Sequence, residues 1–107
     1  MTEEAMRFNE GKAELSYLID FPNAMRGLAS VASFGAEKYK RDNWKKGLYS
    51  NQIIDSLLRH LTSLKAGEVE DPESGLLHTS HIAWNAFALA EMMQTRPEFT
   101  DLWGRDD

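Results

Sequence analysis

The sequence predicts an all-α protein, a small antiparallel helical bundle. Apolar residues recur at helical spacing in three blocks of the 107-residue chain, and polar or proline-containing segments separate the blocks. No stretch alternates apolar and polar residues as a half-buried strand does, and no internal repeat or low-complexity tract is present. The length suits one domain with a modest core, so a single helical domain is expected over residues 1–107.

The first helix is predicted near residues 22–40. Pro22 suits the first turn of a helix, and Asp20 just upstream is expected to cap it. Apolar residues from Met25 to Tyr39 then follow the helical period. Two glycines in this block lower its helix propensity, but they allow a neighbouring helix to approach closely. The segment RDNWKKG that follows is expected to be a loop.

The second and third helices are predicted near residues 51–66 and 76–95. Ser50 is a good N-cap for the second helix, and Gly67 is well placed to end it. Pro97 marks the end of the third helix. The joint EVEDPESG between the two helices is acidic and contains proline and glycine, so a loop or turn is expected there.

Composition and charge exclude several classes of protein. The formal net charge is −5, from 12 basic and 17 acidic residues, so nucleic acid is not expected as a partner. The absence of cysteine excludes disulfides and thiolate metal sites. No apolar run approaches the roughly 20 residues that span a bilayer, and the start MTEEAMRFNEGK is too acidic for a signal peptide. A cytoplasmic protein without a membrane partner is expected.

All three histidines fall within residues 59–85. His60 follows the apolar stripe of the second helix and is expected to face inward. His78, His81 and Asn85 stand at i, i+3 and i+7, on one face of the third helix. If these helices pack antiparallel, the histidines meet at the acidic joint. Helical bundles commonly build metal sites from facing helices in this way.

Imidazoles and carboxylates bind divalent metals and move protons. The candidate metal ligands are His60, Glu68, Asp71, His78 and His81. The candidate catalytic acids and bases are His60, Glu68, Asp71 and Glu73. Carboxylates suit Mg²⁺ or Mn²⁺, whereas histidines favour Mn²⁺, Co²⁺ or Zn²⁺. The alternative is structural, because a single inward histidine is more often a hydrogen-bonded core residue and the acids suit a solvated turn that caps the third helix.

Two basic clusters can hold phosphate. One contains Arg7 and Lys12 in RFNEGK, and the other runs from Lys38 to Lys46, where Trp44 and other aromatic or amide residues interrupt the cations. Lysine and arginine neutralise phosphate charge, and an aromatic ring can stack on a base. The alternative for the second cluster is a solvated helix end, where positive charge is favourable in any case.

The chain resembles a family of small proteins common in tailed phages. The resemblance lies in three segments in this order: RFNEGK, SFGAEKYKRDNWKKG and LLRHLTSLKAGEVEDPESGLLHTSHIAWN. The family is named dATP/dGTP diphosphohydrolase-like, after members that remove pyrophosphate from purine deoxynucleotides. The resemblance covers roughly Arg7 to Leu89. One departure is Ala13, where many members carry proline, and it concerns the N-terminal turn rather than the chemistry. The matching positions are Arg7, Gly11, Lys12, Gly35, Ala36, Lys38, Tyr39, Asn43, Trp44, Gly47, Arg59, His60, Gly67, Glu68, Asp71, Glu73, Ser74, Gly75, His78, His81 and Asn85.

A more distant similarity is to MazG-type all-α nucleoside triphosphate pyrophosphohydrolases, which bind magnesium through carboxylates on two facing helices. Glu68 and Asp71 have a similar E-x-x-D spacing, but they flank a predicted loop, and the third helix offers histidines instead of acids. A phosphohydrolase of the HD type is less consistent with the sequence, because no adjacent His-Asp pair occurs.

The resemblance implies metal-dependent hydrolysis of purine (deoxy)nucleoside triphosphates to monophosphate and pyrophosphate. The candidate substrate-binding residues are then Arg7, Lys12, Lys38, Tyr39, Asn43, Trp44, Arg59 and Asn85. A second hypothesis is a phage-type protein that binds or sequesters a nucleotide or cyclic nucleotide without turnover, and a third is a helical adaptor. For a phage-encoded protein the location would be the host cytoplasm. Three helices enclose little volume, so we expect a homo-oligomer, a dimer or tetramer, to complete the bundle.

Overall fold

A computed structural model describes residues 2–103 of the chain, and its architecture is all-α, as predicted. Three α-helices form the body: α1 (Pro22–Tyr39), α2 (Ser50–Lys65) and α3 (His78–Thr95). Three short 3-10 helices accompany them: η1 (Leu15–Asp20), η2 (Asn43–Lys46) and η3 (Pro97–Phe99). The described residues contain no strand, and their one isolated β-bridge joins Glu70 to Leu77.

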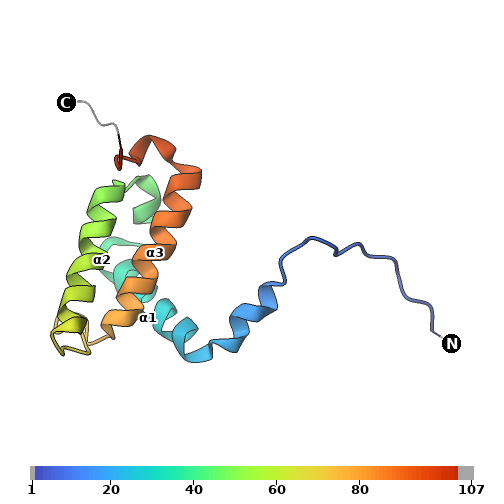
Figure 1. Ribbon diagram of the computed structural model, residues 1–107, viewed down its shortest axis with the longest axis horizontal. Coiled ribbons are helices and arrows are strands. Elements are labelled where there is room, and N and C mark those ends of the chain that lie inside the picture. Colours follow the sequence, from blue (N-terminus) through green and yellow to red (C-terminus); the bar gives the residue numbers. More distant parts are fainter. Residues whose placement is uncertain (1, 104–107) are drawn as a thin grey trace.

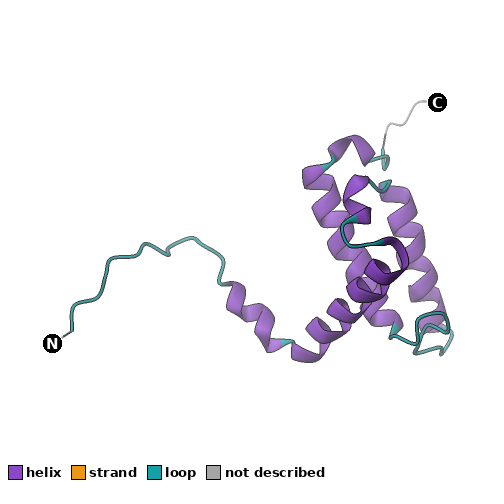
Figure 2. Cartoon of the chain, turned by 180° about the vertical axis from the view of Figure 1, so that it is seen from behind, coloured by secondary structure: helices purple, strands orange, loops and turns teal. Residues whose placement is uncertain are grey.

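Helices α2 and α3 lie side by side and run antiparallel, and α1 packs against α3 (Figure 1). The view from behind shows the connecting loop of α2 and α3 at one end of the bundle (Figure 2). The buried apolar residues come from all three helices: Val31, Ile53, Ala88 and Met92. This small core fixes the α2–α3 hairpin, and the hairpin in turn positions the histidines.

The start of α1 differs from the prediction. Asp20 was expected to cap the helix, but it is the last residue of η1, and Phe21 occupies the N-cap position without a side-chain cap hydrogen bond. The chain reaches Pro22 through the 3-10 turn, in which the Phe21 N–H donates to the carbonyl of Leu18 at 3.2 Å. Proline in the first turn therefore marks the helix start correctly, and the local turn takes the place of the expected cap.

The start of α2 is capped from far along the chain. Ser50 was predicted as the N-cap, but it is the first helical residue, and its buried hydroxyl has no hydrogen-bond partner. The Asn51 N–H donates instead to Asp101 Oδ1 at 2.9 Å, and Asn51 Nδ2 donates to the Asp101 carbonyl at 2.7 Å. Asp101 therefore caps the N-terminus of α2, and its hydrogen bonds attach the segment after η3 to the body.

The end of α2 matches the prediction at Gly67. Its φ of +101° allows a Schellman motif, in which the Gly67 N–H donates to Leu64 and the Glu68 N–H donates to Ser63, both at 3.0 Å. The chain then doubles back through the bridge between Glu70 and Leu77. Because Leu77 belongs to this bridge and the Leu76 carbonyl accepts from the Asp71 N–H, α3 begins at residue 78 rather than 76. The turn sets the acidic joint against the first turn of α3.

Residues 2–14 form no helix or strand, and together with η1 they extend away from the bundle (Figure 1). Helix α3 ends at Thr95, just before Pro97 as predicted, and η3 begins at Pro97; the Phe99 ring packs against Tyr49 with centroids 5.0 Å apart. Among the described residues, no helix combines the length and the apolar character that crossing a membrane requires.

Candidate functional site

The three histidines meet where α2 ends and α3 begins. His60 Nδ1 lies 2.9 Å from His78 Nδ1, and the His60 ring stacks on the His81 ring with centroids 4.4 Å apart. His78 and His81 are buried in the first turn of α3, and His60 faces them from α2. The antiparallel hairpin thus brings imidazoles 18 residues apart in the chain into hydrogen-bonding distance.

Glu68 fixes the orientation of His78. Its Oε1 lies 2.8 Å from His78 Nε2, and the imidazole is 2% exposed. A carboxylate oxygen accepts hydrogen bonds, so His78 Nε2–H donates to Glu68 Oε1, and the Nδ1 atom of His78 is the ring nitrogen that faces His60. A carboxylate behind a histidine is a common arrangement in metal sites, where it orients the ring and raises its basicity.

Ser74 links Asp71 to His81. The Ser74 N–H and hydroxyl both donate to Asp71 Oδ2, at 3.2 and 3.1 Å, and Ser74 Oγ lies 2.7 Å from His81 Nε2. Since the hydroxyl proton goes to Asp71, His81 Nε2–H donates to Ser74 Oγ. The candidate residues from sequence omitted Ser74, although a serine three positions after an aspartate is a recognisable turn signal.

The donors of His60, Asp71 and His78 form a set that fits a metal ion. One ligand atom from each lies within 4.8 Å of the others. Two imidazoles and one carboxylate favour Mn²⁺, Co²⁺ or Zn²⁺ over Mg²⁺. The other two predicted ligands lie outside this set. Glu68 makes a hydrogen bond with His78, and His81 makes a hydrogen bond with Ser74.

The surroundings set suitable protonation states. Burial is the main cause that lowers the pKa of His60 and of His81, and the neighbouring imidazole of His81 lowers that of His60 further. Burial alone would raise the pKa of Asp71, but the two hydrogen bonds from Ser74 and the nearby histidines lower it overall. The lowered pKa values of His60 and His81 favour neutral imidazoles, and the lowered pKa of Asp71 favours a charged carboxylate, which are the states that bind metals.

The cluster opens on a cavity of about 1530 Å³ between α1, α2 and α3. The cavity is lined by all the predicted site residues of the body: Lys38, Tyr39, Asn43, Trp44, Arg59, His60, Glu68, Asp71, Glu73, His78, His81 and Asn85. Trp44 meets Trp84 edge to face with centroids 6.4 Å apart, which gives this part of the cavity an aromatic wall. The Asn85 amide already donates to the His81 carbonyl at 2.8 Å.

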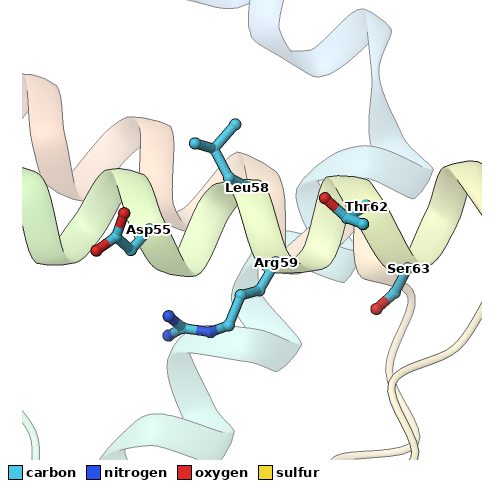
Figure 3. Close-up of a pocket in the computed structure, with 5 residues that line it drawn as sticks. All are labelled: Asp55, Leu58, Arg59, Thr62 and Ser63. Carbon is cyan, nitrogen blue, oxygen red and sulfur yellow. The ribbon is translucent and has the colours of Figure 1, made fainter.

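Cations surround the acidic and imidazole groups. Lys38 Nζ binds Glu73 Oε1 at 2.7 Å, and this hydrogen bond raises the pKa of Lys38. Arg59 leaves α2 on the side opposite Leu58 (Figure 3), where it lines the cavity and a shallow hollow that also involves Asp55. After α1, Lys40 and Asp42 have positive φ angles of 78° and 68°, a strained backbone typical of functional loops.

Arg7 and Lys12 are not brought to this cavity. Both are exposed and lie in the extended segment before η1, and neither lines the cavity described by residues 28–91. The two basic clusters predicted from the sequence therefore lie apart in the folded chain. The cluster after α1 belongs to the cavity, whereas RFNEGK points away from it (Figure 1).

Fold and site together define a small all-α protein with a histidine and carboxylate cluster in a cation-rimmed cavity. The chain belongs to the family described as dATP/dGTP diphosphohydrolase, N-terminal, which matches residues 2–102. This confirms the family suggested by the sequence motifs. The dATP/dGTP diphosphohydrolase of Salmonella phage PMBT28 is 35% identical over 96 residues, which are 90% of this chain and 32% of the relative. The chain thus spans about a third of that relative's length. No solved structure matches the chain.

Proposed function

We propose that the chain hydrolyses purine deoxynucleoside triphosphates to monophosphate and pyrophosphate, at the cluster and with a divalent metal ion. The observation that carries the proposal is the convergence of His60, Asp71 and His78 donors within 4.8 Å, inside a cavity rimmed by cations. Family membership and the name of the phage relative support the same activity. The reaction would use free nucleotides in the host cytoplasm.

His60, Asp71 and His78 would hold the ion, and Glu68 would keep His78 in the ligating tautomer. When bound, a divalent ion offsets phosphate charge and lowers the pKa of coordinated water. Mn²⁺, Co²⁺ and Zn²⁺ suit this donor set better than Mg²⁺. His81 positions the site, because it stacks on His60 and anchors the Ser74–Asp71 turn.

The rim provides phosphate and base contacts. Lys38 and Arg59 neutralise the triphosphate, and Tyr39 and Trp44 offer faces on which a purine can stack. When a substrate phosphate binds Lys38, Glu73 is released from its ion pair with that lysine. Because the other two acids are held by His78 and Ser74, Glu73 is our candidate base for the proton that water loses. Water bonds to the α-phosphorus, and the bridging oxygen leaves with pyrophosphate.

The test incubates the purified chain with each of the four dNTPs and with Mg²⁺, Mn²⁺, Co²⁺ or Zn²⁺, and resolves the nucleotide products. We expect dAMP or dGMP and pyrophosphate only when metal is present. Asp71→Asn and His81→Ala should lose most of this activity, and Glu70→Gln, a change of an exposed acid in the same joint, should keep it. Binding by calorimetry without any product would assign sequestration instead. Full activity of both site variants would refute the proposal.

A further inference from the structure

The chain exposes more surface than a compact protein of its mass. Its accessible surface is 8836 Å², whereas a compact monomer of 12.2 kDa exposes about 6,100 Å². Its radius of gyration is 17.8 Å, against about 13 Å for a compact domain of this length. Residues 2–21, the N-terminal arm, leave the bundle (Figure 1). The family match begins at residue 2, so the arm belongs to the domain.

The arm carries an apolar surface that has no cover within one chain. In and next to η1, Leu15 is 76% exposed, Tyr17 66%, Ile19 68% and Phe21 62%. A group of large apolar side chains this close together is typical of a protein–protein contact. The surplus surface is also of the size that stable dimers bury, which is about 800 Å² or more for each partner.

The cavity offers the matching surface. Its volume of about 1530 Å³ exceeds the roughly 300–1,000 Å³ of ordinary ligand pockets, so a nucleotide leaves space for a further occupant. Leu28 and Phe87 give part of its lining an apolar character, and Phe87 is 59% exposed. The charges are complementary as well, since the arm has five acids and two bases, whereas residues 38–46 have five bases and one acid.

We propose that the arm of each copy docks into the cavity of a second copy of this chain. The apolar residues of η1 cover the apolar part of the cavity, and the preceding segment brings Arg7 and Lys12 to the partner's cluster. Eight residues separate Arg7 from Leu15, a reach of roughly 26 Å in extended form, which is enough to follow the cavity wall. Each site is then completed by two chains, and the second copy supplies phosphate-binding cations that one chain holds apart from its cavity.

The first test measures mass by light scattering at micromolar concentration, and it does not depend on any activity. The unaltered chain should have at least twice the 12.2 kDa of one copy. Ile19→Asp combined with Leu18→Asp should reduce the mass to that of one copy, because both side chains are exposed on η1. Ser16→Asp adds charge to the same turn without removing an apolar group and should leave the assembly intact. A monomeric unaltered chain, or an assembly that survives the double change, would overturn the proposal.

The second test rests on the proposed hydrolysis and asks where the arm acts. Arg7→Ala/Lys12→Ala chains and Asp71→Asn chains, each inactive alone, are co-expressed. Exchange of arms gives each mixed pair one complete site, so random pairing restores about a quarter of the unaltered activity. If the arm instead serves its own chain, the mixture stays inactive, and the proposal fails. If the unaltered chain has no activity, the proposed function is wrong. The docking proposal is then tested by the mass measurement alone.

Discussion

The rings of His60 and His81 are stacked, with centroids 4.4 Å apart and planes only 5° from parallel. This contact joins the two halves of the cluster. On one side, His60 reaches His78 and, through it, Glu68. On the other, His81 reaches Ser74 and Asp71. Proton or metal binding at one imidazole is therefore felt by the other, because two cationic rings in this position would repel each other.

The stability of the metal-free chain should fall on mild acidification. The folded pKa values of His60 and His81 lie below the ordinary 6.5, mainly through burial, so the unfolded chain binds protons more tightly. The stabilisation is complete above about pH 6.5 and is lost as the pH falls through that value toward the folded pKa values. Each kcal/mol lost lowers the Tm of a domain this size by about 4–8 °C.

Melting curves between pH 8 and 5 in the presence of a chelator measure this effect. His60→Gln should flatten the pH dependence, because it removes one of the two titrating rings and the repulsion between them. A Tm that stays level or rises between pH 7 and 5.5 would contradict the burial of neutral imidazoles at this site.

Glu68→Gln should weaken metal binding by about 10–100-fold with little change in Tm. Glutamine keeps the length of the side chain but loses the charge that fixes the His78 tautomer through the 2.8 Å bond. Calorimetric titration with Mn²⁺, Co²⁺ and Zn²⁺ gives the affinities. Glu70→Gln is the matched control, since Glu70 is an exposed acid two positions away. Equal affinities in both variants would remove Glu68 from the site.

Lys38→Gln should raise the KM for the nucleotide by about tenfold, because it removes a charged phosphate contact. It should leave the Tm unchanged, because both members of the Lys38–Glu73 ion pair are exposed and such pairs contribute little to stability. Steady-state kinetics at saturating metal test this, with Lys65→Gln at the end of α2 as the control. A KM that does not move would place the triphosphate elsewhere in the cavity.

The sequence predicted those features that depend on local spacing. Helical periodicity and the antiparallel hairpin were sufficient to bring His60 toward His78 and His81, and Gly67 ended α2 through a backbone motif that nearly requires glycine. These predictions succeed because three or four residues of local geometry decide them.

Features that depend on distant contacts could not be predicted. The α2 cap comes from Asp101, 50 residues after Asn51, and no local pattern distinguishes it from a cap by Ser50. The 2.7 Å pair of Lys38 with Glu73 joins positions 35 residues apart. Which ring nitrogen carries a proton depends on partners that only the folded chain provides. The position of Arg7 and Lys12 outside the cavity likewise depends on the course of the whole chain and not on local spacing.

The two glycines of α1 should respond in opposite ways to alanine. At Gly35 an added Cβ meets nothing within 4 Å, so Gly35→Ala should raise the free energy of unfolding by about 0.5–1 kcal/mol through better helix propensity. At Gly27 the same Cβ runs into the side chain of Ser80 on α3, a residue that is 7% exposed and has little room to move. Gly27→Ala should therefore lower the free energy of unfolding by about 1–3 kcal/mol.

Urea denaturation of both variants measures this difference on one helix with one chemical change. Ser80→Ala placed on the Gly27→Ala background removes the hydroxyl that the new Cβ meets, so it should recover part of the loss; the Ser80 Cβ would still lie 3.3 Å away, which prevents full recovery. The close approach of α1 to α3 also sets one wall of the cavity, so Gly27→Ala should weaken nucleotide binding as well. An equal gain in stability from alanine at both glycines would mean that the two helices do not touch at Gly27.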